Sequence, residues 1–375
     1  MIKSEICITK YRGKTFSWFE EMGTMQLLSI SDEKTLIGKI YVGKVKHVVK
    51  NLNACFVEFD VNKIGFLSFA DMFGCENLVE GMNVAVQVVK DASKNKEAVL
   101  TMKLSIPGRY VVALYDNPTV NISRKITGEN RDFLRKSMEN SGSYAVTIRT
   151  NAEKANNMSD VLEERDVLFS LLDDILHKSS TRTCYSCVYE GVPDYLRFVL
   201  GIKEGRYERI ITDDEEIYKN MSSYNPVLYK DEYEFIKLHS LESKIDELLS
   251  SRVWLKSGGN IVIDYTEAMT VIDVNTAKND SKKEREQIAL KTNLEAANEI
   301  ARQIRLRNIS GIIIVDFINM KDEISIEKLV QYLKEELSKD VSRCDFVDFT
   351  KLGLAEIVRK KTTAPITELL ANFYI

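Results

Sequence analysis

The fold class is decided by the stretch NIVIDYTEAMTVIDVN (260–275), together with GIIIVDFINM (311–320) further along the chain. The first holds two β-rich runs around the polar residues TEA, which is typical of two paired strands. The second has an unbroken apolar run, which predicts a fully buried strand. Between them, from about Lys282 to Arg307, apolar residues recur at helical spacing. The alternation of strands and helices to the end of the chain predicts an α/β layer structure.

Working outward, residues 37–104 contain five short β-rich runs divided by polar turns. They are IGKIYVGKVKHVV (37–49), ACFVEFD (54–60), IGFLSF (64–69), VAVQVVK (84–90) and AVLTM (98–102). Five strands in so short a segment predict a small closed barrel. The part between it and the C-terminal third is mixed, with helical patterns at 129–140, 158–178 and 242–251 and a strand pattern at 143–150.

Composition limits the classes of function. The 375 residues include 52 Lys+Arg and 56 Asp+Glu, giving a net charge of −4, so no global positive field attracts a polyanion. Any nucleic-acid binding must therefore come from local basic patches. The apolar stretches are too short for a membrane span, and the N-terminus lacks the apolar core of a signal peptide. Six Cys in so long a chain form no disulfide framework, so we expect a reduced, cytoplasmic protein.

Two carboxylates stand where apolar strands end: Asp273 ends TVID and Asp316 ends IIIVD. If the two strands are neighbours, both side chains can coordinate a hard divalent cation such as Mg²⁺. Asn275 lies on the same strand face as Asp273 and could orient substrate or water. The alternative is that strand-end aspartates cap turns or the following helix. Asp264 and Glu267 are weaker candidates, and a turn-stabilising role is the simpler interpretation of Glu267.

Other catalytic arrangements find little support in the sequence. His47, His177 and His239 have no Ser or Cys near them in a recognisable triad pattern. There is no phosphate-binding loop of the G-x-x-x-x-G-K-[ST] type. Cys184 and Cys187 form one C-x-x-C, and without a second ligand pair we interpret them as ordinary thiols in a strand.

Basic and aromatic residues suggest where RNA or phosphate could bind. Phe56 and Phe66 can lie on adjacent barrel strands and stack bases, with Lys96 in a turn nearby, although both Phe could equally be core residues. Arg149 and Thr150 end a strand, and an Arg fork beside a hydroxyl suits a terminal phosphate. The alternative is an ordinary exposed strand end, which has the same pattern. Two Arg-rich clusters are phosphate-contact candidates or solvated faces: Arg302, Arg305 and Arg307, and Arg359, Lys360 and Lys361.

Three long stretches closely resemble the ribonuclease E/G family of endoribonucleases: SGGNIVIDYTEAMTVIDVNTAK (257–278), TNLEAANEIARQIRLRNISGIIIVDFINM (292–320) and TKLGLAEIVRKKT (350–362). Upstream, IGKIYVGKV (37–45) resembles the family's RNA-binding barrel, and ISRK (122–125) with IRT (148–150) its 5′-end sensor. The resemblance implies an α/β multi-subdomain fold with RNase H-like and DNase I-like subdomains. We expect the RNase H-like part at 1–36 and 190–255, an OB-type (S1-like) barrel at 37–106, the sensor at 107–189 and the DNase I-like catalytic part at 256–375.

The resemblance also implies roles for single residues. Asp273 and Asp316 match the metal-binding catalytic aspartates, and Asn275 the asparagine that assists them. The RNA-binding positions of the family's barrel are matched by Phe56, Phe66 and Lys96. Matches to the 5′-monophosphate sensor are Arg149 and Thr150, with Arg124 and Arg343 as further supports.

The function implied is Mg²⁺-dependent cleavage of single-stranded RNA to 5′-phosphate and 3′-hydroxyl products, with preference for 5′-monophosphorylated substrates, in rRNA maturation or mRNA turnover. The alternative is a non-catalytic RNA-binding protein that assists ribosome assembly. Asp273, Asn275 and Asp316 together favour the enzyme. The family's Cys-rich zinc link, expected just after RKKT, is not found in the sequence, so we expect no zinc link and no zinc-linked dimer, and leave the oligomeric state open.

Overall fold

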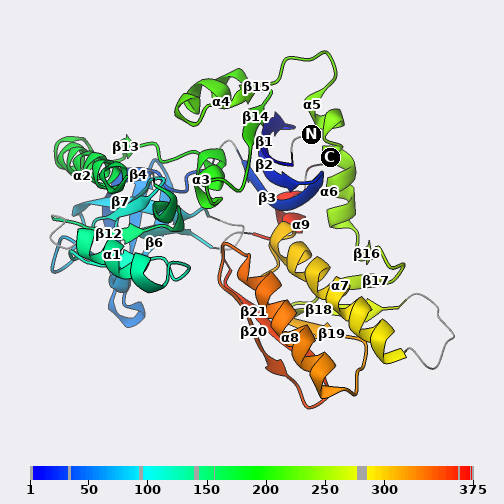
Figure 1. Ribbon diagram of the computed structural model, residues 1–375. Helices are drawn as coiled ribbons and strands as arrows, with labels where there is room; N and C mark the ends of the chain where they lie inside the picture. The colour runs from blue at the N-terminus through cyan, green and yellow to red at the C-terminus, as the bar shows by residue number, and fades with distance from the viewer. Residues whose placement is uncertain are drawn as a thin grey trace. The chain divides into compact units, whose positions relative to one another are not determined.

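The computed structural model describes residues 3–32, 35–92, 96–138, 143–155, 157–276, 285–361, 364–371 and 373. The chain forms two compact units (Figure 1): unit 1 comprises residues 1–32 and 207–375, and unit 2 comprises residues 33–206. Within the described residues, no helix is both long enough and apolar enough to cross a membrane.

Unit 2 contains the predicted barrel. Its strands are β4 (Ile40–Val49), β5 (Ala54–Asp60), β6 (Lys63–Ser68), β7 (Asn83–Lys90) and β8 (Ala98–Thr101), with short 3-10 turns at Lys50–Leu52 and Phe69–Asp71. They pair in the order β4-β5-β6-β8-β7, and β7 pairs back to β4, so the sheet closes. Every second residue of β5 points into a core that holds Cys55, Val57 and Phe59. The prediction of a closed five-stranded barrel is therefore confirmed.

The second part of unit 2 is a small mixed sheet with helices. The sheet has the order β11-β12-β10-β9. Its strands are β9 (Ser105–Pro107), β10 (Val111–Leu114), β11 (Val120–Ile122) and β12 (Ala145–Ile148), and the helices are α1 (Gly128–Met138), α2 (Met158–Thr181) and α3 (Asp194–Gly201), with a 3-10 turn at Thr150–Lys154. Both helical patterns predicted here are confirmed, and residues 139–140 of the first lie outside the described residues. The predicted strand around the C-x-x-C is shorter: β13 (Cys187–Tyr189) adds to β4, while Cys184 lies in a turn.

The first sheet of unit 1 is built from the N-terminal strands and two later ones. Its order is β15-β14-β1-β2-β3, with β1 antiparallel to β2 and parallel to β14. The strands are β1 (Ser4–Tyr11), β2 (Lys14–Glu21), β3 (Thr24–Asp32), β14 (Arg209–Thr212) and β15 (Val227–Leu228). The helices nearby are α4 (Glu215–Asn220), α5 (Phe235–Leu238), α6 (Leu241–Leu249) and α9 (Ile366–Leu369), with a 3-10 turn at Ser222–Tyr224. Phe16 and Trp18 pack with residues of α5, α6 and α9 in one core.

The second sheet of unit 1 contains the stretch that decided the fold class. Its order is β16-β17-β18-β19-β21-β20. The strands are β16 (Arg252–Trp254), β17 (Asn260–Tyr265), β18 (Met269–Asn275), β19 (Gly311–Asp316), β20 (Cys344–Phe349) and β21 (Ala355–Arg359), and the helices are α7 (Arg285–Leu306) and α8 (Glu323–Ser338). β17 and β18 form the predicted antiparallel pair. The predicted helix is confirmed as α7, and residues 282–284 lie outside the described residues.

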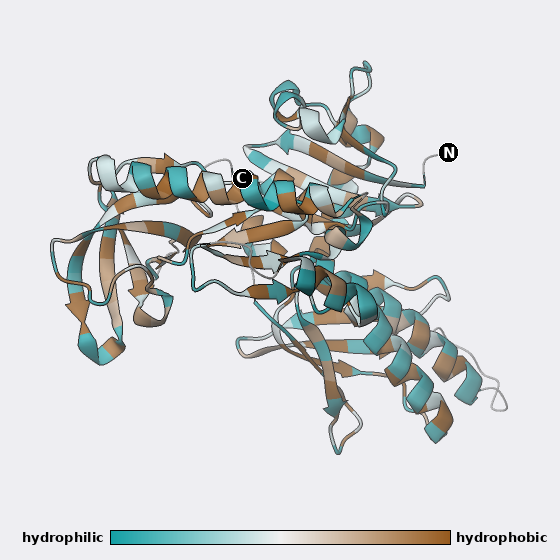
Figure 2. Ribbon diagram, turned by 60° about the vertical axis from the view of Figure 1, so that its left-hand side comes forward, coloured by the Kyte–Doolittle hydropathy of each residue, from teal (hydrophilic) through white to brown (hydrophobic). Residues whose placement is uncertain are grey.

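The prediction that GIIIVDFINM forms a fully buried strand is wrong. Only one face of β19 is covered: Ile313 and Val315 are fully buried, whereas Ile312 is 48% exposed. α7 and α8 pack on that one face, where they share a core with Ile263, Ile272 and Ile357 of neighbouring strands. Both helices carry hydrophilic and hydrophobic residues along their length (Figure 2), as expected of helices that pack one side on a sheet. An unbroken apolar run cannot distinguish one covered face from two.

The Arg-rich clusters are mainly structural rather than surface patches. Arg305 and Arg307 are 8% and 1% exposed; Arg305 donates to the Glu336 carbonyl, and Arg307 to the Gln303 side chain. Arg359 is 5% exposed and forms a buried ion pair with Asp340, 2.8 Å between Nε and Oδ2. Sequence shows the charge of these side chains but not the carbonyls and carboxylates that bury them.

Candidate active site

Asp273 and Asp316 are placed side by side by the pairing of their strands. β18 and β19 are parallel neighbours, and Asp273 is the register partner of Asp316. Residues paired in this way project from the same face of a sheet, about 4.8 Å apart along the pairing direction. Both side chains lie on the exposed face, because the alternating pattern of β18 buries Thr270, Ile272 and Val274 instead. The crossover through α7 thus brings together two carboxylates far apart in sequence.

Asn275 is oriented towards the same carboxylates. It lies two residues after Asp273, so it shares the exposed face of β18. Its Nδ2 donates a hydrogen bond to Asp273 Oδ2 over 2.7 Å. The amide therefore fixes one oxygen of Asp273 and leaves the other directed elsewhere.

The carboxylate pair suits a hard divalent cation. Asp273 and Asp316 offer only oxygen donors, and both are exposed, so water can complete the coordination shell. Mg²⁺ is typically bound by one or two carboxylates while it keeps several waters. The donor set of this face therefore fits Mg²⁺ better than Zn²⁺, which takes nitrogen and sulfur ligands readily.

The two weaker carboxylate candidates differ in position. Asp264 is exposed on β17 and pairs with Val271. It lies on the same sheet face as Asp273, two positions along β17 from Val262, which is the register partner of Asp273. Glu267 lies in the turn between β17 and β18 and is exposed, as expected of a turn residue. Neither belongs to the paired set formed by Asp273 and Asp316.

Two side chains of α7 that sequence reasoning did not single out hold the loop after Asp316. Asn293 is fully buried; its Nδ2 donates to the Ile318 carbonyl over 2.8 Å, and its Oδ1 accepts from the Ile318 N–H over 2.9 Å. Glu286 Oε1 accepts from the backbone N–H groups of Lys321 and Asp322. A polar residue on the apolar face of a predicted helix was the signal that could have identified Asn293.

The aromatic pair of the barrel lies outside the barrel core. Phe56 and Phe66 are register partners on β5 and β6, with ring centroids 6.0 Å apart in an edge-to-face arrangement. Both are half-buried, whereas their neighbours Cys55, Val57 and Leu67 form the interior. β5 and β6 pair so that the two rings are adjacent. The alternative that both Phe are core residues is wrong. Lys96 is exposed and lies two residues before β8, whose Val99 pairs with Phe66.

Arg149 and Thr150 follow β12 in unit 2. Arg149 donates from Nη1 to the Gly108 carbonyl and from Nη2 to the Leu200 carbonyl, 2.8 Å in each case. The Thr150 hydroxyl lies 3.0 Å from that of Ser123. Since Ser123 directly precedes the exposed Arg124, the structure brings the ISRK and IRT segments together.

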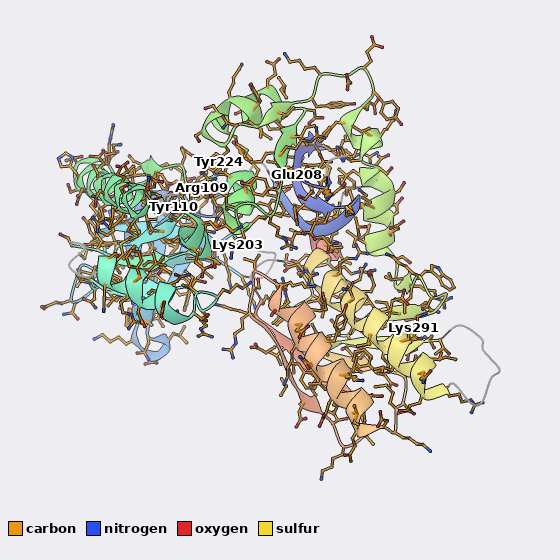
Figure 3. The ribbon with its side chains drawn as sticks, viewed as in Figure 1. Arg109, Tyr110, Lys203, Glu208, Tyr224 and Lys291 are labelled. Atoms are coloured by element: carbon orange, nitrogen blue, oxygen red, sulfur yellow. The ribbon has the colours of Figure 1, made fainter. Side chains whose placement is uncertain are left out.

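The strand ends around Arg149 are held by two residues that sequence reasoning missed. Arg131 of α1 donates to the carbonyls of Ile122, Ser123 and Ile126, which fixes the ISRK turn. Glu164 of α2 accepts from three consecutive N–H groups, those of Arg109, Tyr110 and Val111. Arg109 in turn pairs with Glu204, and Figure 3 labels Arg109 and Tyr110 in this region.

Arg343 belongs to the other unit. It directly precedes β20 of unit 1, is exposed, and pairs with Asp345 over 2.6 Å. Thr150 and Arg124 are thus joined through Ser123 within unit 2, while Arg343 directly precedes a strand of the sheet that carries Asp273 and Asp316.

Comparison with known proteins shows the family of the chain. A family model described as "Ribonuclease E/G family" matches residues 105–362. Ribonuclease G of Escherichia coli strain K12 is 30% identical over 98% of this chain and 82% of that protein. Ribonuclease G of Haemophilus influenzae is 30% identical over 91% of this chain and 75% of that protein, and ribonuclease E of Nostoc sp. 32% identical over 93% and 54%.

The match extends over most of the chain in every case. The chain therefore belongs to the ribonuclease E/G family.

Proposed function

We propose that this protein cleaves single-stranded RNA endonucleolytically with Mg²⁺ held by Asp273 and Asp316, and prefers substrates with a 5′-monophosphate. The observation that carries the proposal is the register pairing of the two aspartates on the exposed face of β18 and β19. The enzyme class rests on the family: the chain is an endoribonuclease, a hydrolase that acts on RNA.

The chemistry follows from the donors on this face. A divalent cation bound by the two carboxylates supplies Lewis-acid polarisation of the scissile phosphate and lowers the pKa of the attacking water. Asn275 orients the Asp273 carboxylate through its hydrogen bond, so that one oxygen remains directed at the reaction centre. Attack of water at phosphorus breaks the bond to the 3′ oxygen, which takes a proton, and yields a 3′-hydroxyl and a 5′-phosphate.

Substrate recognition is assigned to unit 2. Phe56 and Phe66 present ring surface outside the barrel core, where bases of an unpaired strand can stack, and Lys96 offers an exposed cation for a phosphate. Arg149, Thr150 and Arg124 of unit 2 form the proposed sensor of the 5′-monophosphate. A supporting role for Arg343, which belongs to unit 1, is implied by the family resemblance alone. Single strands are the substrate class because their bases can be splayed onto aromatic rings.

The subdomain assignment is also a proposal. We infer that residues 1–36 and 190–255 form an RNase H-like part and residues 256–375 a DNase I-like part, with the barrel at 37–106 and the sensor at 107–189. The support is that two different sheets dominate the two proposed parts, β1 to β3 with β14 and β15 in the first and β17 to β21 in the second. The boundaries differ in detail, because β16 of the first part pairs with β17 and residues 190–206 belong to unit 2.

An assay of product ends tests the proposed reaction. A 5′-monophosphorylated, unstructured RNA is incubated with the protein and Mg²⁺, and the downstream and upstream fragments are examined separately. We expect a 5′-phosphate on the downstream fragment, a 3′-hydroxyl on the upstream one, and no cleavage in EDTA. A 2′,3′-cyclic phosphate, or undiminished cleavage in EDTA, would contradict the mechanism.

Replacement of Phe56 tests the barrel surface. Phe56→Ala should raise the Kd for an unstructured RNA by about 5- to 100-fold, because stacking contributes about 1–3 kcal/mol per base. The melting temperature should change little, since Phe56 is half-buried and lies outside the barrel core. Val79→Ala, at an exposed apolar residue outside the barrel strands, is the matched control and should bind RNA normally. A large loss of stability with unchanged affinity would show that Phe56 contributes to folding and not to RNA binding.

Replacement of Arg149 tests the sensor. Arg149→Ala should reduce the preference for a 5′-monophosphate over a 5′-hydroxyl by about 10- to 100-fold, because hydrogen bonds to a charged group contribute about 1.5–3 kcal/mol each. Cleavage of the 5′-hydroxyl RNA should remain measurable. Arg135→Ala, at an exposed Arg of α1, is the control. Equal preference ratios in Arg149→Ala and the unchanged protein would remove the sensor assignment.

A further inference from the structure

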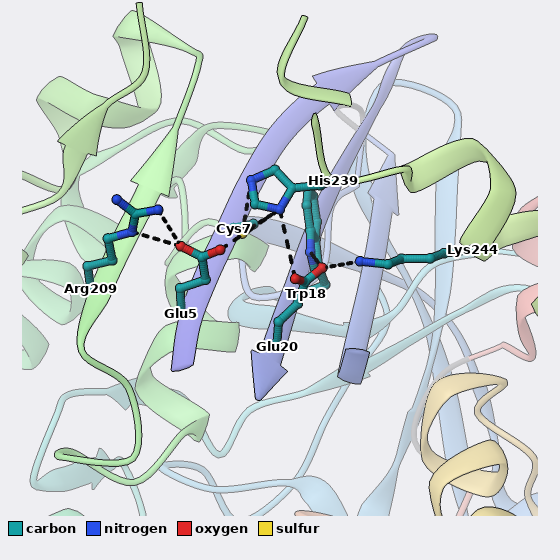
Figure 4. Close-up of polar contacts among 7 residues, drawn as sticks. All are labelled: Glu5, Cys7, Trp18, Glu20, Arg209, His239 and Lys244. Carbon is teal, nitrogen blue, oxygen red and sulfur yellow. Dashed lines mark hydrogen bonds and ion pairs between the residues drawn. The ribbon is translucent and has the colours of Figure 1, made fainter. Parts of the chain in front are cut away.

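A buried polar cluster in unit 1 is used by none of the chemistry above. Glu5 and Cys7 lie two residues apart on β1, so they share a sheet face, and Glu20 of β2 is the register partner of Glu5. His239, directly after α5, reaches the same face from above (Figure 4). Cys7 is fully buried, and Glu20 and His239 are 5% and 9% exposed. No local sequence pattern reveals this cluster, because 232 positions separate Cys7 from His239.

The potential donor atoms converge on one point. His239 Nδ1 lies 3.8 Å from Cys7 Sγ and 3.9 Å from Glu5 Oε1. It also lies 3.8 Å from Glu20 Oε2. The donor atoms of Glu5, Cys7 and His239 all lie within 4.8 Å of one another, and among the described residues no other group of three or more His, Cys, Asp or Glu does so.

These distances suit ligands of a shared ion better than partners in hydrogen bonds. An N–H···O hydrogen bond spans about 2.7–3.2 Å, shorter than either distance from His239 to a glutamate. Donor atoms around a tetrahedral Zn²⁺, with bonds of about 2.0–2.3 Å, lie roughly 3.3–3.8 Å from one another. Glu5, Cys7 and His239 lie near this spacing, and a shift of the Glu20 side chain would bring its Oε2 in as the fourth donor.

Each glutamate is already oriented as a ligand requires. Arg209 Nη2 holds Glu5 through Oε2 at 2.7 Å, which leaves Oε1 facing His239. Glu20 accepts from Trp18 Nε1 and from Lys244 through Oε1, which leaves Oε2 facing His239. Partners of this kind, bound to the far oxygen of a carboxylate, orient metal ligands and tune their affinity.

The surroundings favour a structural ion over a reactive thiol. Cys7 is fully buried, so its thiol is shielded from solvent and from substrates. The His239 ring is fixed between aromatic rings, 4.5 Å from Phe235 and 5.5 Å from Trp18 between centroids. Four protein donors leave no open position for a substrate.

We propose that Glu5, Cys7, Glu20 and His239 form a structural site for Zn²⁺ that fastens the α5–α6 segment to β1 and β2. The mixed nitrogen, sulfur and oxygen donors select a borderline-soft ion over Mg²⁺. This site is separate from Asp273 and Asp316, and it stands whether or not those residues bind Mg²⁺.

Cobalt titration of the full chain tests the site. Protein stripped with EDTA is titrated with Co²⁺, whose thiolate charge-transfer absorption reports a Cys ligand and is silent for carboxylate sites. We expect one equivalent to produce this band, Zn²⁺ to displace it, and Zn²⁺ to raise the melting temperature. Cys7→Ser should abolish the band, and Glu20→Gln should weaken Co²⁺ binding at least about tenfold.

The C-x-x-C, with Cys184 half-buried and Cys187 exposed, is the main rival thiol site, so Cys187→Ser is the matched control and should keep the band and the thermal shift. Loss of the band in Cys187→Ser would overturn the proposal. So would the absence of a thiolate band in the unchanged protein, an outcome that does not depend on whether any variant folds.

Discussion

Asp316→Asn is expected to lower kcat for RNA cleavage by about 10³-fold or more. A metal-supported phosphoryl reaction gains several kcal/mol from the ion, and each 1.36 kcal/mol is a factor of ten in rate. The substitution keeps the size of the side chain but removes the charge that, with Asp273, would hold the cation. Because Asp316 is exposed on β19, the melting temperature and the Kd for RNA should change little.

The control for Asp316→Asn is Asp348→Asn. Asp348 is an exposed aspartate on β20 of the same sheet, and its Oδ1 accepts from the Phe349 N–H, a contact that an asparagine oxygen can keep. Asp348→Asn should cleave at the rate of the unchanged protein. If Asp316→Asn cleaves equally fast in Mg²⁺, the paired carboxylates are not the catalytic centre, and another part of this endoribonuclease must supply it.

The barrel and the β17–β18 pair could be predicted because their information is local. The β-rich pattern of ACFVEFD is visible in seven residues, and the structure forms a strand there with Cys55, Val57 and Phe59 buried. Whether a strand is covered on one face or on both is not determined by the residues of that strand. The exposure of Ile312 depends on which elements cover the far side of the sheet, and nothing in GIIIVD encodes it.

The carboxylate pair was predicted only on a condition. Sequence places Asp273 and Asp316 at strand ends, but their register depends on the crossover through α7 and the parallel pairing of β18 with β19. The same limit applies to the burial of Arg359 on β21, because its partner Asp340 lies in the connection between α8 and β20. It also applies to the cluster around His239, because its neighbours Cys7 and Glu20 lie near the N-terminus of the chain.

Asn293→Leu is expected to lower both stability and turnover, because Asn293 fixes the loop that leaves Asp316. Leucine removes two hydrogen bonds and leaves the N–H and carbonyl of Ile318 without these partners. A buried backbone group left without its partner costs about 1–3 kcal/mol, and Ile318 is half-buried, so the free energy of unfolding should fall by about 2 kcal/mol. Denaturant titration measures this loss, and Asn298→Ala, at an exposed Asn of α7, should cost far less.

Kinetics distinguish a positioning role of Asn293 from a purely structural one. Ile318 is two residues from Asp316, so a loosened loop displaces the carboxylate in the folded protein as well. At a temperature well below unfolding, Asn293→Leu should therefore lower kcat, raise the Mg²⁺ concentration needed for half-maximal rate, and leave the KM for RNA nearly unchanged. A variant that is less stable but shows the normal kcat and Mg²⁺ dependence would confine Asn293 to stability, since Asp316 then keeps its place without the Asn293 hydrogen bonds.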